Sequence, residues 1–402
     1  MQLSELHQQL LRHDRTKDTY AEGVVATLLA GAIQLEASDV HLQPTAQGFD
    51  VKLRIDGVLQ TVGNLPRGEK TDTSARLKIM AGLLTYRTDI PQEGRVSELS
   101  HGHEVRVSTF PALHGERVVI RILWQKETLH HLEDLGLDTA TTKELASLLQ
   151  ESSGMILIAG PAGSGKSTTA YACLRHIDSL EDGGRSIVTL EDPIETEIPG
   201  ISQSHIRPSA GFDFATGLRS LMRQDPEVIL VGEMRDPVTV ETAMQASLTG
   251  QLVISTFHSG SAAEAIRRLI DMNIPTYMIQ SALLGVLHQR LVRKLCDCAV
   301  ACEESQRYGF RLEGMRQPVG CEKCRGTGYL GRTLLGEWLV PHKHRLGQVA
   351  LESATTAMIE AWAHEAGMAS RWEQADAMLS AGITSPAEIR RVLGFREMPS
   401  SG

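Results

Sequence analysis

This sequence of 402 residues has little of what marks several common classes of protein. Aromatic residues make up only 4% of it, and 40 Lys and Arg stand against 49 Asp and Glu. The resulting formal charge of −9 argues against a generally polybasic nucleic-acid binder. The longest weakly interrupted apolar run, near residues 24–33, is about half the roughly 20 residues that a membrane-spanning helix needs.

Leader peptides and disulfide frameworks are not indicated either. The first 15 residues are polar and contain no apolar signal-peptide core, so we expect a cytoplasmic protein whose membrane role, if any, comes from docking. Five of the six cysteines lie between Cys296 and Cys324, and clustering of this kind indicates a metal site. Asparagine occurs only as Asn64 and Asn273, neither of which begins an N-K-x-D motif, which weakens a GTPase interpretation.

Hydropathy patterns predict an α/β protein with a smaller N-terminal α/β domain at residues 1–130. A helical pattern covers residues 24–35. Two alternating segments joined by Asp56-Gly57 predict a β-hairpin, since this dipeptide favours a tight two-residue turn. Two more alternating segments, at residues 103–110 and 117–123, predict a further pair of strands.

Residues 131–290 show the pattern of a parallel sheet that is buried on both faces. Short apolar runs recur, separated by helical stretches, at residues 155–159, 186–190, 228–231 and 252–255. Each run is followed by polar or glycine residues, and ligands bind beyond the carboxyl ends of such strands. The cysteines define a segment at residues 291–340. A helical region at residues 341–402 follows, with a Ser385–Glu388 capping box.

A phosphate-binding loop is predicted directly after the first of these strands. Residues 160–167 fit G-x-x-x-x-G-K-[ST] between a strand and a helix, which is the context that the motif requires. Lys166 is expected to reach the β- and γ-phosphates, and Ser167 to coordinate Mg²⁺. The predicted nucleotide-binding residues are Gly160, Pro161, Ala162, Gly163, Ser164, Gly165, Lys166, Ser167 and Thr168.

Three further strand ends carry candidate catalytic residues. Glu233 follows the run at 228–231, where a carboxylate could activate water; the alternative is a solvated loop residue. Glu191 and Asp192 could handle Mg²⁺ or water, or form an exposed acidic turn. His258 follows the run at 252–255 and could sense the γ-phosphate or serve only the structure.

Several motifs together resemble the secretion ATPases of the type II secretion and type IV pilus assembly family. The resemblance runs from about residue 20 onward. It rests on residues 37–44, 54–59, 91–95 and 105–123, on the phosphate loop, on an aspartate box at 189–195, on 218–236, on a histidine box at 246–269, and on 290–296 and 320–339.

The resemblance implies a homo-hexameric ring motor with a RecA-like core that hydrolyses ATP to ADP and phosphate. In such proteins the N-terminal domain closes over the nucleotide and contributes arginines. Arg106 and Arg121 occupy similar positions here, although a purely structural role stays open for both. Glu233 stands in the family's catalytic position and His258 in its histidine box.

The cysteine segment resembles the family's metal motif, which consists of two C-x-x-C pairs. The second pair, Cys321 and Cys324, is intact, whereas the first reads Cys296-Asp-Cys298-Ala-Val-Ala-Cys302. Four thiolates suit a closed structural Zn²⁺ site. The predicted ligands are Cys296, Cys298, Cys321 and Cys324, with Cys302 as an alternative to Cys298, unless the altered spacing has lost the metal.

The predicted function is an ATP-driven motor for a type II secretion pseudopilus or a type IV pilus, peripheral at the inner membrane. Its expected partner is an inner-membrane platform or docking protein. Family members usually carry a further N-terminal docking domain, whereas only about 20 residues precede the recognisable helix here. The resemblance therefore leaves the docking surface open.

Two rival functions remain from the sequence. A RecA-like nucleic-acid motor would use residues 290–332, which are locally basic, but the scarcity of aromatics leaves few stacking platforms, and no stable nucleic-acid partner is expected. A non-catalytic nucleotide-binding assembly or regulatory protein would not need Glu233. Pilus retraction motors lack the cysteine segment, so its presence favours an assembly or secretion motor.

Overall fold

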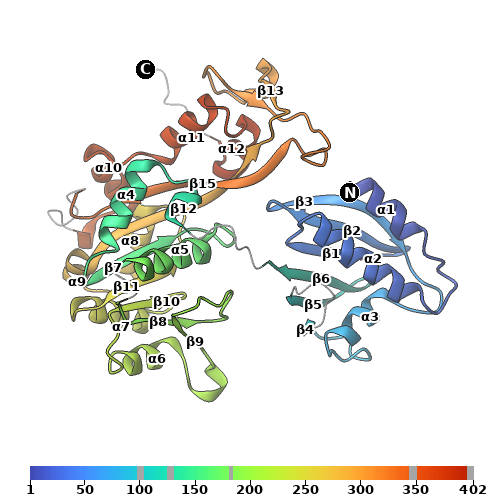
Figure 1. Ribbon diagram of the computed structural model, residues 1–402, viewed down its shortest axis with the longest axis horizontal. Coiled ribbons are helices and arrows are strands. Elements are labelled where there is room, and N and C mark those ends of the chain that lie inside the picture. Colours follow the sequence, from blue (N-terminus) through green and yellow to red (C-terminus); the bar gives the residue numbers. More distant parts are fainter. Residues whose placement is uncertain (97–103, 125–130, 181–183, 344–350, 396–402) are drawn as a thin grey trace. The chain divides into compact units, whose positions relative to one another are not determined.

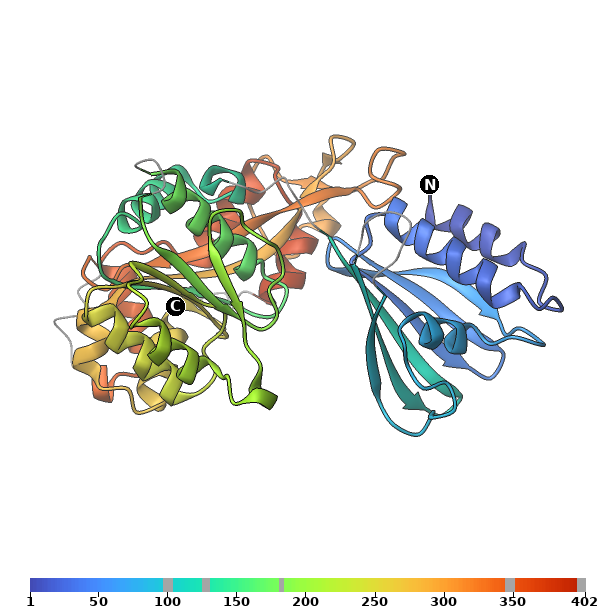
Figure 2. The same cartoon turned by 60° about the horizontal axis from the view of Figure 1, so that its bottom comes forward.

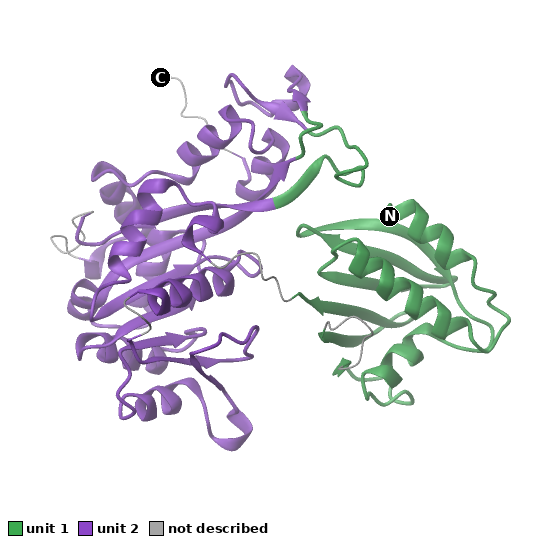
Figure 3. Ribbon diagram, in the orientation of Figure 1, with its two compact units in different colours: residues 1–126, 296–299, 318–331 green, residues 127–295, 300–317, 332–402 purple. Residues whose placement is uncertain are grey.

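The chain forms two compact units, which the computed structural model describes over residues 1–96, 104–124, 131–180, 184–343 and 351–395 (Figure 1). Unit 1 consists of Met1–Lys126, Cys296–Ala299 and Pro318–Gly331, and unit 2 of Glu127–Leu295, Val300–Gln317 and Arg332–Gly402 (Figure 3). In the part of the chain that is described, no helix has both the length and the apolar character to cross a membrane.

Unit 1 is built on a six-stranded antiparallel sheet with the strand order β3-β2-β1-β6-β5-β4. Its elements are α1 (Leu3–Leu11), α2 (Tyr20–Gln34), β1 (Asp39–Thr45), β2 (Gly48–Ile55), β3 (Val58–Pro66), α3 (Thr73–Met80), β4 (Gln92–Val96), β5 (Glu104–Ala112) and β6 (Gly115–Leu123). The predicted hairpin is confirmed, since β2 and β3 pair around Asp56 and Gly57, whose φ values of 48° and 80° suit a type I′ turn.

One face of this sheet is apolar because strand residues alternate between the two faces. Val40, Val107 and Ile120 share a buried core with residues of α1 and α2 such as Leu6 and Leu28. Figure 2 shows both helices lying side by side over this face. The opposite face carries charged side chains, which are described with the candidate site.

Unit 2 contains a seven-stranded sheet with the order β15-β12-β7-β11-β10-β8-β9. Neighbouring strands from β12 to β9 are parallel, as predicted for residues 131–290. The strands are β7 (Gly154–Ala159), β8 (Ile187–Glu191), β9 (Ser202–His205), β10 (Val228–Val231), β11 (Leu252–Phe257), β12 (Leu283–Leu295) and β15 (Tyr329–Leu339).

Helices cover both faces of this sheet. Alternate residues of β7 divide between two cores: Met155 and Leu157 face one, and Ile156 and Ile158 face the other. This two-sided burial explains why the strand is continuously apolar in sequence. The helices are α4 (Thr139–Leu148), α5 (Lys166–Ser179), α6 (Phe214–Leu221), α7 (Pro237–Leu248), α8 (Ala262–Asp271), α9 (Thr276–Ala282), α10 (Thr356–Glu365), α11 (Arg371–Ser380) and α12 (Pro386–Leu393).

The cysteine segment is an insertion between two neighbouring strands of the large sheet. The chain leaves the sheet after Leu295 at the end of β12 and returns at Tyr329 in β15. Between them lies a small antiparallel pair, β13 (Val300–Ala301) and β14 (Arg316–Gln317). The two strand ends therefore fix both ends of the segment.

Helix α12 begins at its predicted N-cap, Ser385, but the predicted partner in the capping box, the Glu388 carboxylate, instead ties the helix to β12. Ser385 accepts a hydrogen bond from the Glu388 backbone N–H, and Pro386 occupies the first turn. The Glu388 carboxylate, which is fully buried, binds the guanidinium groups of Arg293 and Arg391. Burial alone would raise the pKa of Glu388, but these hydrogen bonds lower it to about 2.

We expect Glu388→Gln to lower the free energy of unfolding at pH 7 by about 3–5 kcal/mol, since it removes a buried negative charge that binds the guanidinium groups of Arg293 and the more exposed Arg391. The folded-state pKa lies below that of an unfolded Glu, so this stabilisation is complete above roughly pH 4.3 and is lost as the pH falls toward 2. Urea unfolding at pH 7 and pH 3 measures the difference, which should shrink at the lower pH. Glu365→Gln, at an exposed position, is the control; an equal effect of both variants would contradict the expectation.

Candidate functional site

The loop at residues 160–165 joins β7 to α5 and requires glycine at three positions. Gly160, Gly163 and Gly165 have φ values of 145°, 73° and 88°, which residues with a Cβ rarely adopt. A Cβ on Gly160 would also lie 2.4 Å from the Gln289 carbonyl oxygen. The loop therefore curls tightly and directs the N-terminus of α5, with its unpaired N–H groups, to the carboxyl end of the sheet.

The predicted nucleotide-binding residues lie together on this loop and on the first turn of α5. Lys166 donates from Nζ to the carbonyl oxygens of Gly160 and Pro161, both at 3.0 Å. Its partial burial lowers the pKa of Lys166, and the negative charges of Glu233 and Glu195 oppose this shift. Pro161, Ala162 and Gly163 are exposed, and Lys166, Ser167 and Thr168 are partly exposed, so the loop is open to a ligand.

Glu233 and His258 meet at the carboxyl ends of β10 and β11. His258 Nε2 lies 3.1 Å from Glu233 Oε1, and Arg235 donates a hydrogen bond to Oε2 at 2.6 Å. Burial would raise the pKa of Glu233, but the Arg235 hydrogen bond and the charges of Arg235, His258 and Lys166 hold the pKa below its usual value. Desolvation and the charge of Lys166 lower the pKa of His258. This arrangement keeps a carboxylate ionised close to the phosphate loop.

Glu191 and Asp192, the neighbouring acidic residues after β8, differ in their surroundings. Glu191 is 4% exposed, and its carboxylate accepts hydrogen bonds from Tyr171, Thr189 and Gln203. Asp192 is half exposed and lies 3.7 Å from His205 Nε2. Asp192 is thus the more accessible of the two, whereas Glu191 ties β8 to α5 and β9.

Arg106 and Arg121 belong to a row of charged residues across the open face of the sheet in unit 1. Arg54, Asp39, Arg121, Arg106 and Arg95 are directly opposite one another on successive strands and so share one face. Asp39 is the single carboxylate in this register row. Its two oxygens lie 3.0 Å from Arg121 Nε and 3.5 Å from Arg54 Nε.

The two predicted arginines are presented differently. The Arg121 side chain is 65% exposed, although its Nε is bound by Asp39. Arg106 is more buried, and within the described residues its Nε makes no hydrogen bond, with Glu104 4.0 Å away. A row with more positive than negative charge offers binding groups for an anion.

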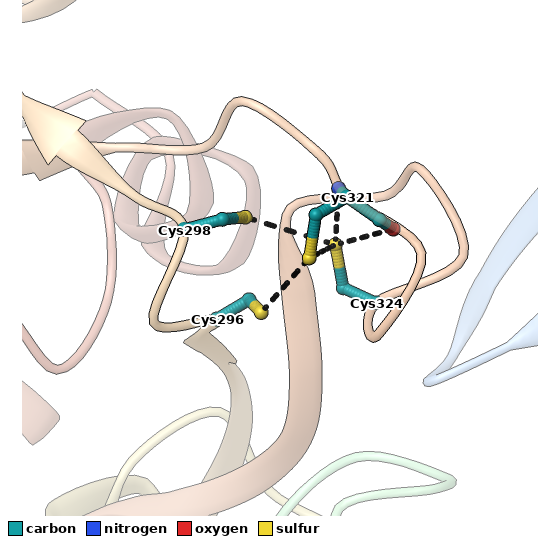
Figure 4. Close-up of side chains that lie close together, drawn as sticks. All are labelled: Cys296, Cys298, Cys321 and Cys324. Carbon is teal, nitrogen blue, oxygen red and sulfur yellow. Dashed lines mark hydrogen bonds between the residues drawn. The ribbon is translucent and has the colours of Figure 1, made fainter.

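Four cysteines converge in unit 1, as Figure 4 shows: Cys296, Cys298, Cys321 and Cys324. Their sulfurs all lie within 4.8 Å of one another. The Sγ atoms of Cys321 and Cys324 are 3.7 Å apart, and those of the Cys296–Cys321 and Cys298–Cys324 pairs are 3.8 Å apart. A tetrahedral Zn²⁺ site with Zn–S bonds of about 2.3 Å has edges of about 3.8 Å, so the donor set fits this ion.

Backbone groups around Cys324 favour its thiolate. The N–H groups of Cys321 and Gly328 donate to its sulfur at 3.1 Å and 3.2 Å. Burial opposes ionisation, but these hydrogen bonds lower the pKa of Cys324 to about 6. The thiolate is the form that binds metal. Cys302, by contrast, packs in a different core with Val292 and Met315, and its sulfur contacts the Glu303 carbonyl oxygen.

The sequence interpretation missed several residues that contact the predicted ones. Arg235 is only two positions from Glu233, so in an extended segment the two side chains lie on the same side. Asp39 and Gln289 approach their partners across strand pairs, 82 residues from Arg121 and 125 residues from Ser164 respectively. No local spacing in a single sequence indicates such contacts.

Comparisons with known proteins agree over most of the chain. The family model described as type II/IV secretion system protein matches residues 14–391. The chain is 42% identical over 325 residues to type II secretion system protein E of Dickeya dadantii, covering 79% of this chain and 65% of that protein. It is 38% identical over 385 residues to the type IV pilus assembly ATPase PilB of Thermus thermophilus, covering 92% and 43%. The chain thus spans less than two thirds of the length of both relatives.

Solved structures support the fold. The pilus retraction motor PilT with bound ADP is 26% identical, with a TM-score of 0.58 and coverage of 88% of this chain and 96% of that one. The ATPase DotB of Yersinia pseudotuberculosis has a TM-score of 0.69 at 21% identity, covering 94% and 95%, and shows the fold alone. The α/β architecture with a RecA-like core is therefore confirmed.

Proposed function

This chain belongs to the type II/IV secretion system protein family, and we propose that it is an ATPase that powers assembly of a type II secretion pseudopilus or a type IV pilus. The observation that carries the proposal is the ionised Glu233, held by His258 and Arg235 at the strand ends beside the phosphate loop. A carboxylate in this state can act on water at a phosphoanhydride.

In this proposal ATP binds with its phosphates on the loop of residues 160–165. The backbone N–H groups at the start of α5 and the Lys166 ammonium bind the β- and γ-phosphate oxygens, which compete with the loop carbonyls for the lysine. Ser167, assisted by Asp192, would hold Mg²⁺, which neutralises phosphate charge when bound. Glu191 is buried and holds neighbouring side chains by hydrogen bonds. In this proposal it does not contact the substrate.

Glu233 orients the attacking water and takes its proton at a carboxylate oxygen. His258, 3.1 Å from the carboxylate, would keep it in position and sense the γ-phosphate. The transition state also needs its developing negative charge neutralised. Arginine suits this task because it stays protonated. We assign that task to Arg106 and Arg121, by likeness to the family and because their row carries excess positive charge.

The larger assembly in this proposal is a homo-hexameric ring at the cytoplasmic face of the inner membrane. Domain closure on ATP and reopening on product release would move an inner-membrane platform protein. Zn²⁺ bound by Cys296, Cys298, Cys321 and Cys324 would have a structural role, since four thiolates leave no position for a substrate. It would hold together an insertion that has little core of its own.

The first test is the variant Glu233→Gln, which keeps the side chain's size and removes the base. We expect ATP turnover to fall by at least 100-fold while ATP still binds, because general-base catalysis contributes about 10²–10⁴-fold. Phosphate release measures turnover, and a fluorescent ATP analogue measures binding. Glu241→Gln, on the exposed surface of α7, is the control. Normal turnover by Glu233→Gln would rule out the assignment.

A second test asks whether turnover needs the ring. We expect ATP hydrolysis per subunit to rise with protein concentration, in step with particle size from light scattering on the same samples. The reason is that arginines supplied by a neighbouring subunit are present only in the assembly. Full turnover by a particle that remains monomeric would contradict the ring.

The metal is tested by zinc content. We expect about one Zn²⁺ per chain, and a loss of most of it in Cys298→Ser, because the variant removes one of four ligands. Cys302→Ser, which alters a thiol outside the cluster, should keep its zinc and serves as the matched control. Metal analysis of protein purified without added chelator gives the ratio. Equal loss from both variants, or none from either, would refute the ligand set.

A further inference from the structure

Gln289 is a buried polar side chain on β12 that the proposed chemistry does not use. It is 0% exposed, and β12 is the strand next to β7, which ends in the phosphate loop. Its Nε2 donates to the Ser164 carbonyl oxygen at 2.7 Å. Its Oε1 accepts from Thr169 Oγ1 at 3.0 Å. The amide of one side chain thus binds both the phosphate loop, at Ser164, and helix α5, at Thr169.

These two points lie on either side of the residues that would hold the phosphates. Ser164 precedes Lys166 and Ser167 in the loop, and Thr169 follows them in the first turn of α5. The amide also approaches Gly165 so closely that an added Cβ there would lie 3.3 Å from Nε2. Gln289 therefore sets the distance between β12 and the segment that carries the phosphate-binding groups.

If residue 289 only packed in the core, we would expect an apolar side chain there. Leu287 and Leu291, two residues before and after Gln289, point to the same side of β12 and belong to or contact the apolar core beneath α5. Burying an amide among such residues is costly unless its polar atoms are hydrogen-bonded. In Gln289 both the donor and the acceptor are directed at the loop segment.

We propose that Gln289 is a positioning residue that holds the phosphate loop in its nucleotide-binding conformation before the nucleotide arrives. The loop needs such support because its glycines keep left-handed backbone angles at an entropic cost. Holding it in advance lowers the cost of ordering on binding and so raises affinity. The inference rests on the proposed function, since it assumes that the loop binds nucleotide.

Of the phosphates that the loop would contact, the β-phosphate is common to ATP and ADP, so the effect belongs to binding rather than to the chemical step. For Gln289→Leu we expect the Kd of both nucleotides and the KM for ATP to rise about 10-fold, equivalent to about 1.4 kcal/mol. The kcat should change less than about threefold, since interactions that are equal in ground and transition states affect KM alone. Thr169→Val, which removes one of the two hydrogen bonds and keeps the side chain's shape, should give a smaller rise of about threefold.

Two matched controls separate the loop from general stability. Gln374→Leu removes an amide that accepts from the Gly336 N–H on β15. Thr242→Val removes a buried hydroxyl that donates to the Val238 carbonyl oxygen within α7. Without nucleotide, Gln374→Leu should lower the unfolding temperature about as much as Gln289→Leu, and Thr242→Val about as much as Thr169→Val. Both control variants should leave Kd and KM unchanged. The double variant Gln289→Leu/Thr169→Val should bind no worse than Gln289→Leu alone, because the shared hydrogen bond is already lost.

The outcomes separate this inference from the function on which it rests. If the wild-type chain hydrolyses ATP and Gln289→Leu loses only thermal stability, with Kd and KM unchanged, the positioning role is wrong and the function stands. If the wild-type chain neither binds nor hydrolyses ATP, the proposed function itself fails. Should Gln289→Leu not fold, unchanged Kd and KM in Thr169→Val would overturn the inference.

Discussion

The arrangement of the nucleotide site depends on the parallel pairing of β7 with β11 and of β11 with β10. Parallel neighbours end at the same edge of the sheet, so segments as far apart in sequence as the phosphate loop and His258 meet there. The phosphate loop, Glu233 and His258 are each the first polar groups after an apolar strand. Burial of the apolar side chains on both faces fixes the positions of the strands. The candidate catalytic residues lie directly after the buried segments end.

The same sheet organises the cysteine segment. Because β12 and β15 are neighbours in the sheet, the insertion between them begins and ends at nearly fixed points, and its two cysteine pairs are brought together by the strand ends. This explains why a first pair with a one-residue spacer can still join the second. Cys298 reaches the cluster from a turn directly after the strand, whereas Cys302 has already passed into a separate core.

Local signals in the sequence predict much of this structure and fail in a consistent way. The turn at Asp56-Gly57, the four buried strands and the phosphate loop follow from patterns within about ten residues. The roles of Glu191 and of Gln289 do not. Whether Glu191 faces solvent or hydrogen-bond donors depends on how the fold brings its neighbours together, since its three donors lie on α5, β8 and β9. In the same way, the alternating pattern of β12 does not reveal that Gln289, a polar residue between Leu287 and Leu291 on one side of the strand, is hydrogen-bonded to the phosphate loop.

The arginine row on unit 1 holds four arginines and one aspartate, and Glu104 lies beside two of the arginines, Arg95 and Arg106. Strands are about 4.8 Å apart, and at physiological ionic strength charge is screened over about 8 Å. The attraction of each guanidinium group therefore extends over about two strands of the sheet. A compact polyphosphate on the row can contact several guanidinium groups at once, whereas the parts of a long polyanion that extend beyond the row gain no attraction from it. The short range of each charge therefore favours compact anions over extended ones, without a pocket of matching shape.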